Sequence, residues 1–250
     1  MSEDEKQLLG EAMKLLGQFD GLPHLDRLEA LRVGLDIRPS RQIISFTKNP
    51  LGDSTLLGQI FTLISNRVVI DLHYHVFDVP DEHRSVVVHP YMLREYNHRW
   101  YLICAADNTG KILNFALDRI ERVEPLPGRA YRPYDGDLGE RFEDIIGVTL
   151  YDDCPLQTIV FWVSDRSKDY VATKPIHESQ KHYRGDKEAE MRRQYPTLEG
   201  GAFFTIDCIE NYELIRELTS FGADLVVLSP EEVRRSVIQR IEEMYQVYHV

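Results

Sequence analysis

The sequence predicts an α+β protein in which N-terminal linker helices precede a small antiparallel β-barrel and a C-terminal α+β sandwich. Apolar residues follow a helical period near the N-terminus, a series of short strands follows without an intervening helix, and strands alternate with helices thereafter. We therefore predict three parts: a helical linker or dimerisation region (1–59), the barrel (60–130) and a C-terminal domain (131–250). With 250 residues and 43% hydrophobic positions, the chain can bury a full core.

The N-terminal part has the periodicity of amphipathic helices. Apolar residues recur at helical spacing over 8–19, and a glycine and a proline at 21–23 end that run. A second helix is predicted over 24–33, and a third begins at Asp53 or Ser54, which can cap it. Isolated helices this short are marginal in water, so we expect them to pack on the chain's own core, on a dimer partner or on a missing upstream domain.

From Val68 the apolar period changes to two, which is typical of a half-buried strand. Its polar face carries Asp71, His73 and His75. Short strands joined by tight turns favour a small antiparallel barrel. The further strands of this barrel are predicted at 85–89, 93–106, 112–117 and 120–124.

The C-terminal part mixes strands and helices. Strands are predicted over 158–163 and 202–209, and the charged segment 183–196 is predicted to be an exposed hairpin or loop. Asn211 is placed to cap a helix. Ser229 is followed by a proline and two glutamates, which predicts a capping box at the start of the final helix.

Catalytic motifs are missing from the sequence. It has no GxSxG, P-loop, GxGxxG, HExxH or EF-hand pattern, so we expect a protein that is not an enzyme. An enzyme with an unrecognised site, such as a nuclease, is the least favoured alternative. Asp71, His73 and His75 could form part of a metal site, but the sequence places no further ligand beside them. We therefore interpret them as ordinary polar strand positions and predict no metal and no cofactor.

Charge restricts the possible partners. The formal net charge of −12 would repel a phosphate backbone, so contact with nucleic acid requires a local basic patch. Between Arg84 and Arg132, eight basic residues stand against five acidic ones, although an ordinary mixed surface explains this equally well. The three cysteines form no CxxC, the N-terminus is acidic, and every apolar run is too short to span a membrane. These features predict a cytoplasmic protein without membrane contact.

Aromatic and basic residues gather in the middle of the predicted barrel. On the strand that begins at Trp100, this residue and Leu102 share one face and are expected in the core, whereas Tyr101 points to the other face. Arginine binds phosphate through a planar fork and also stacks on bases, and tyrosine offers a flat face with a polar tip. A small barrel that carries both is typical of modules that hold nucleotides or single-stranded nucleic acid.

The order of these residues resembles the WYL domain of bacterial transcriptional regulators. Pro90 and Leu93 precede the Trp100–Leu102 triplet, and the run Leu117–Ile120 follows it, as in that family. One position departs from the pattern: where the family usually has an arginine after a phenylalanine, this sequence has Ala116. This chain would thus lack one of the basic residues of the family's pocket, and Arg94 or Lys111 could compensate for it.

The resemblance covers 60–125 and extends more weakly over 145–250. It implies an Sm- or SH3-like barrel that senses a nucleotide or a short single-stranded nucleic acid, in a protein that forms a homodimer. It also implies an N-terminal winged helix, for which 1–59 is too short and too acidic, so operator DNA would be bound only through an attached domain that is missing here. The alternative is a protein-interaction or dimerisation module without a nucleic-acid ligand. The ligand-binding residues expected from the resemblance are His89, Tyr91, Arg94, Arg99, Tyr101 and Arg119.

Overall fold

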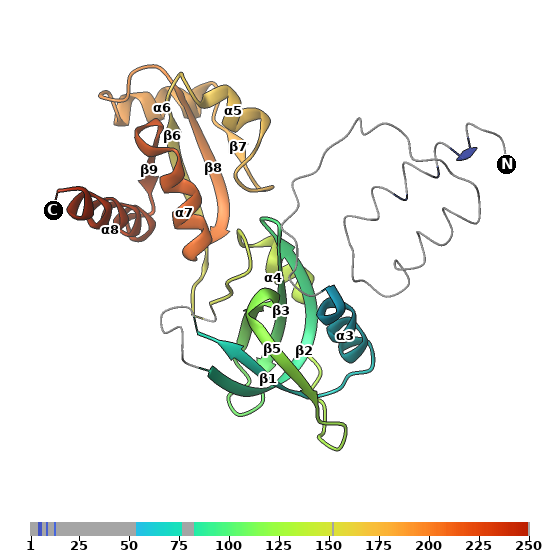
Figure 1. Cartoon of the computed structure of the whole chain (residues 1–250). Helices are drawn as coiled ribbons and strands as arrows, with labels where there is room; N and C mark the ends of the chain where they lie inside the picture. The colour runs from blue at the N-terminus through green and yellow to red at the C-terminus, as the bar shows by residue number, and fades with distance from the viewer. Residues whose placement is uncertain are drawn as a thin grey trace. The chain divides into compact units, whose positions relative to one another are not determined.

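The computed structural model describes residues 54–76, 83–151 and 153–249, together with the isolated positions 5, 6, 9 and 13. The chain separates into two compact units, Met1–Asp135 and Gly136–Val250 (Figure 1). Apart from positions 9 and 13, the helices predicted over 8–33 lie outside the described residues. The division of the chain at 59/60 and 130/131 stays a prediction.

The first unit is built on a five-stranded antiparallel sheet with the strand order β4-β3-β2-β1-β5. The long strand β2 joins two halves of this sheet. Its residues up to Val88 pair with β1, its residues from Val88 onward pair with β3, and the register shifts between Pro90 and Met92. The elements of this unit are α3 (Ser54–Ser65), β1 (Ile70–His75), β2 (His83–Tyr96), β3 (Arg99–Ala106), β4 (Ile112–Ala116), η3 (Leu117–Arg119) and β5 (Ile120–Pro125).

One face of the sheet builds the core together with α3 (Figure 1). The buried residues of α3, which include Leu57 and Ile60, follow the helical period and pack with strand residues such as Leu72 and Leu102. Trp100 is partly buried against the same cluster, which confirms its predicted core position. Because side chains alternate along a strand, the residues between these core positions lie on the other face.

The α+β class is confirmed, but the sheet is open and the predicted closed barrel is not observed. Strands β4 and β5 form its two edges, and no pairing between them is present in the described part of the chain. Pairing of β4 with β3 ends at Ala116, after which η3 buries Leu117 in the core and Ile120 starts the pairing of β5 with β1. The strand pattern in the sequence does not show whether the two edge strands pair with each other.

The second unit contains a four-stranded antiparallel sheet of order β7-β8-β6-β9 with helices packed on it. Asn211 caps α7 as predicted: its side chain accepts a hydrogen bond from Leu214 N at 2.8 Å. The elements are α4 (Leu138–Glu143), β6 (Leu156–Val163), α5 (Lys168–Thr173), β7 (Lys181–His182), α6 (Asp186–Gln194), β8 (Ala202–Ile209), α7 (Tyr212–Ser220), η4 (Gly222–Asp224), β9 (Leu225–Ser229) and α8 (Glu231–Tyr248).

Two sequence predictions for this unit are wrong. The segment 183–196, predicted as a hairpin or loop, contains helix α6, whose many charges form its solvent face while Met191 packs with Trp162 of β6. An ion pair of 2.7 Å between Arg192 and Glu188 at i,i+4 spacing supports the helix. Helix α8 is present, but Pro230 is its N-cap and no capping side chain is bonded, so the predicted capping box is not formed. No helix among the described residues is long and apolar enough to cross a bilayer.

Candidate ligand-binding face

Three neighbouring strands place two of the predicted ligand-binding residues in one row across the sheet, together with the departing position Ala116. Arg94 of β2 lies directly opposite Tyr101 of β3, and Tyr101 lies opposite Ala116 of β4. Directly paired residues of antiparallel strands point to the same face, with Cβ atoms about 5 Å apart. This face is opposite to the one that carries Leu102, so the row lies outside the cluster that the sheet forms with α3; Arg94 and Tyr101 are partly buried and Ala116 is buried.

Two further residues extend the row towards the end of the β2–β3 hairpin. Arg99 precedes Tyr101 by two residues on β3 and therefore shares its face, and Tyr96 of β2 lies opposite Arg99. Sequence reasoning missed Tyr96. The alternation of Met92, Arg94 and Tyr96 around the core residue Leu93 is the signal that could have revealed it.

Arg99 is held in place by a carboxylate. Its Nε donates to Asp118 Oδ1 at 2.9 Å and its Nη2 donates to Asp118 Oδ2 at 2.5 Å, which is the bidentate geometry of arginine with a planar anion. The hydrogen bond from Arg99 holds the pKa of Asp118 below its usual range. The same bond raises the pKa of Arg99. The guanidinium group of Arg99 is thus pre-oriented, but one acceptor already occupies its fork.

Arg94 has a different environment. Its side chain is half-buried on the sheet, and burial lowers the pKa of its guanidinium from the usual value. A partly desolvated cation interacts more strongly with an anion than one that is surrounded by water. Arg94 is also the basic residue that lies in the row of Ala116, about two strand spacings or ~10 Å away. Lys111 lies in the turn that precedes β4, outside that row.

His89 and Tyr91 belong to a second group, beyond the register shift of β2. His89 is 1% exposed; its Nδ1 accepts from Arg132 N at 3.0 Å, so Nε2 carries the proton and donates to Asp107 Oδ1 at 2.9 Å. The hydroxyl of Tyr91 donates to Arg132 O at 3.0 Å, and its ring makes an edge contact with Tyr131. Both nitrogens of His89 are therefore occupied: Nδ1 holds Arg132, and Nε2 holds Asp107 in the turn that follows β3.

Arg119 ends η3 and follows Asp118, the carboxylate that holds Arg99. The structure thus brings Arg94, Arg99 and Tyr101 together on one sheet face and places Arg119 in the segment that contacts it. His89 and Tyr91 are separated from this group along β2. The ligand-binding role of all six residues stays a prediction.

These features define a two-unit α+β protein whose first unit carries partly buried arginine and tyrosine side chains on one face of an antiparallel sheet. A family model described as the WYL domain matches residues 55–125, and a second one, described as the WCX domain, matches residues 155–245. The two matches cover well over half of the sequence. The chain belongs to the WYL-domain family, and its WYL domain is followed by a WCX domain.

The solved structures that are similar to this chain include the following two. Proteasome accessory factor B/C (PafBC) of Arthrobacter aurescens is 16% identical with a TM-score of 0.35, and the match covers 95% of this chain and 33% of that one. A structure described as a CRISPR Cas-related protein is 13% identical with a TM-score of 0.43, and the match covers 78% of this chain and 52% of that one. This chain thus spans about a third and about half of their lengths. No curated protein matches the sequence.

Proposed function

We propose that the face formed by Arg94, Arg99 and Tyr101 binds a nucleotide or a short single-stranded nucleic acid. The observation that carries this proposal is the direct pairing of Arg94 with Tyr101, with Arg99 on the same face. A cation beside an aromatic ring fits a ligand that carries both a phosphate and a base. Base stacking on an aromatic side chain contributes about 1–3 kcal/mol and depends little on sequence.

The fork of Arg99 determines how such a ligand binds. A phosphate that contacts Arg99 must displace Asp118 or share the guanidinium with it, because Asp118 accepts two of its hydrogen bonds. Exposed ion pairs contribute only about 0.2–1 kcal/mol, so a phosphate can replace the carboxylate at small cost. Displacement would release Asp118, which lies in η3 between β4 and β5. Binding on the face is thereby linked to the segment that joins the two edge strands.

The proposed role of this binding is regulatory. In a longer protein, the ligand would favour one arrangement of the two units and of an attached DNA-binding domain over another. Such a shift requires that the ligand bind the favoured arrangement more tightly, since equal affinity for both changes nothing. The proposed activity is binding without cleavage of the ligand.

The test is a titration of a fluorescently labelled single-stranded oligonucleotide with the purified chain at two salt concentrations. We expect saturable binding that weakens with salt, because phosphate contacts release counterions. Arg94→Ala and Arg99→Ala should each weaken it about fivefold or more, whereas the control Arg235→Ala, on an exposed position of α8, should not. Absence of binding at low salt, or equal binding by all four proteins, would refute the proposal, and shortened oligonucleotide would refute binding without cleavage.

A second candidate function, association with another copy of the chain, is favoured by α8. The apolar stripe of α8 that includes the buried Val237 continues along the helix as Ile241, Tyr245 and Tyr248, whose exposed fractions are 51%, 59% and 84%. The spacing of these residues places them on one helix face. A second copy of α8 would cover this face, as in a two-helix interface.

Light scattering of the purified chain over a range of concentrations measures this association. We expect the dimer mass at high concentration for the natural chain and the monomer mass for Ile241→Glu, which places a charge in the stripe. Gln246→Glu makes the same charge change on the same helix and should leave the mass unaltered. A monomer at every concentration would exclude this candidate without affecting the oligonucleotide test.

A further inference from the structure

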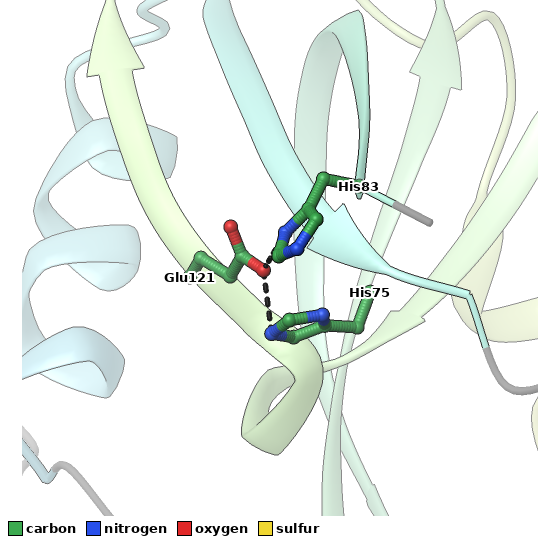
Figure 2. A group of neighbouring side chains, drawn as sticks. All are labelled: His75, His83 and Glu121. Atoms are coloured by element: carbon green, nitrogen blue, oxygen red, sulfur yellow. Dashed lines mark hydrogen bonds and ion pairs between the residues drawn. The ribbon is translucent and has the colours of Figure 1, made fainter. Parts of the chain in front are cut away.

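A cluster of two histidines and a glutamate lies on the first unit, on strands β2, β1 and β5. His75 ends β1 and lies directly opposite His83, the first residue of β2. Glu121 of β5 lies at the register shift between β5 and β1, between the paired residues Ile120 and Arg122. A bulge of this kind redirects a side chain out of the regular alternation. Figure 2 shows the three side chains converging from these strands.

The three side chains meet at one oxygen atom. Glu121 Oε1 lies 2.5 Å from His75 Nε2 and 2.6 Å from His83 Nδ1. The two imidazole rings are 4.5 Å apart between centroids, and the potential ligand atoms all lie within 4.8 Å of one another. The side chains are 43%, 58% and 31% exposed for His75, His83 and Glu121, so an ion and its water ligands can reach them.

We propose that His75, His83 and Glu121 bind a divalent d-block cation, with Zn²⁺ as the ion that fits best. Two imidazole nitrogens and one carboxylate oxygen form a common three-ligand set for Zn²⁺, which completes its tetrahedron with water. The glutamate supplies one negative charge and two neutral imidazoles supply lone pairs, so the site suits a dication better than an anion. Such an ion would join the strands β2, β1 and β5 in a single cross-link.

The observed geometry needs only a small adjustment to accept the ion. With bonds of about 2.0–2.1 Å, the ligand atoms of a tetrahedral zinc site are about 3.3 Å apart. The two nitrogen–oxygen distances of 2.5 and 2.6 Å would therefore have to widen by about 0.8 Å. Rotation of the Glu121 carboxylate and of the two rings can supply this change without moving the strands, because His75 and His83 are directly paired and Glu121 already contacts both of them.

A neighbouring cluster on the same face of β1 shows what distinguishes the proposed site. Asp71, His73 and Glu124 also have ligand atoms within 4.8 Å of one another. There, however, Arg122 Nη1 lies 2.9 Å from Glu124 Oε1, and its Nη2 lies 3.4 Å from His73 Nε2. A guanidinium that already neutralises the cluster opposes a second cation. No such cation contacts His75, His83 or Glu121 in the described part of the chain.

Calorimetric titration of the purified chain with ZnCl₂ tests the proposal. We expect the natural chain to bind one Zn²⁺ ion. The affinity for this ion should fall more than about tenfold in His75→Ala, His83→Ala and Glu121→Gln, because each substitution removes a ligand or its charge. His98→Ala, which removes an exposed histidine of the turn between β2 and β3, is the matched control and should retain it. Co²⁺ in place of Zn²⁺ should give the intense visible absorption of a four-coordinate site.

The conservative Glu121→Gln variant keeps the test valid if an alanine variant fails to fold, which circular dichroism will show. The proposal is overturned if no saturable equivalent is found in the natural chain. It is equally overturned if the affinity is the same in Glu121→Gln as in the natural chain. The result does not depend on oligonucleotide binding, since the two sites lie on different parts of β2.

Discussion

Replacing Asp118 by asparagine should strengthen the binding of an oligonucleotide to this protein. The substitution keeps the size of the side chain but removes the charge that holds the fork of Arg99. A phosphate would then no longer compete with the Asp118 carboxylate for this guanidinium. Most substitutions at a binding site weaken binding, so the expected gain distinguishes the proposed site from a merely structural ion pair.

The size of the gain follows from two contributions. An exposed ion pair of this type contributes about 0.2–1 kcal/mol, which the ligand no longer has to overcome. Removing one negative charge at ~7 Å from a phosphate gives roughly 0.6 kcal/mol at the dielectric constant of water. Together they amount to about 1 kcal/mol, or about a fivefold lower Kd. The gain should shrink as salt is raised, because the Debye length falls below this separation.

The assay is the anisotropy of a labelled single strand, measured for the natural chain, for Asp118→Asn and for Glu231→Gln. The last substitution removes the same charge from an exposed ion pair with Arg234 in the second unit and should leave the Kd unchanged. If Asp118→Asn binds no tighter than the natural chain, or if Glu231→Gln gains as much, Arg99 does not contact the phosphate and the reasoning fails.

The stability of the same variant should depend on pH. Because the pKa of Asp118 is lowered in the folded protein, the pair with Arg99 stabilises the fold above the unfolded pKa of about 3.9, and this contribution is lost as the pH falls through the lowered value. Asp118 is 38% exposed, so the free energy of unfolding of Asp118→Asn should be lower by only about 0.5 kcal/mol at pH 7. Urea unfolding should show the difference vanishing in acid.

Two further predictions concern the packing. Burial raises the pKa of Cys104 far above its usual range and the pKa of Cys208 to about 11, whereas Cys154 is partly exposed. A disulfide reagent should therefore modify one thiol in the folded chain and three in denaturant. In folded Cys154→Ser it should modify none. Gly201→Ala should lower the free energy of unfolding by about 3 kcal/mol, because φ is +63° and the new Cβ would lie 2.3 Å from a backbone oxygen of β6. Gly185→Ala, at φ +60° with no atom within 4 Å of the new Cβ, should lower it by about 1 kcal/mol. Equal losses of stability in urea unfolding would contradict a steric role of the contact at Gly201.

The local elements of this protein were predictable because their signals lie within a few residues. The alternation from Val68 predicted β1, and the preference of asparagine for helix N-termini predicted the cap at Asn211. Helix α6 was not predicted because most of its residues are charged. Its inner side becomes evident only from the packing of the partly buried Met191 against Trp162.

Contacts between distant strands were not predictable from the sequence. The pairing of Arg94 with Tyr101 depends on a register shift at Pro90, which a period of two does not contain. In the same way, Glu121 is 46 residues from His75, and only the register of β5 on β1 brings the two together. The sequence singled out Arg94, Arg99 and Tyr101, but of the three residues of the histidine–glutamate cluster it drew attention only to His75 and interpreted it as an ordinary strand position. The strand register decides which residues meet.

The division of β2 at Val88 limits how this sheet can move. A shift of β2 by one residue would place Arg94 on the core face and Leu93 on the opposite face, so β2 cannot slide along its neighbours. The strand can instead bend, because the pairing passes from β1 to β3 at Val88 and the shift beside Pro90 interrupts the regular ladder of hydrogen bonds. Bending there would change the angle between the part of β2 that pairs with β1 and the part that pairs with β3, and it would leave both registers intact.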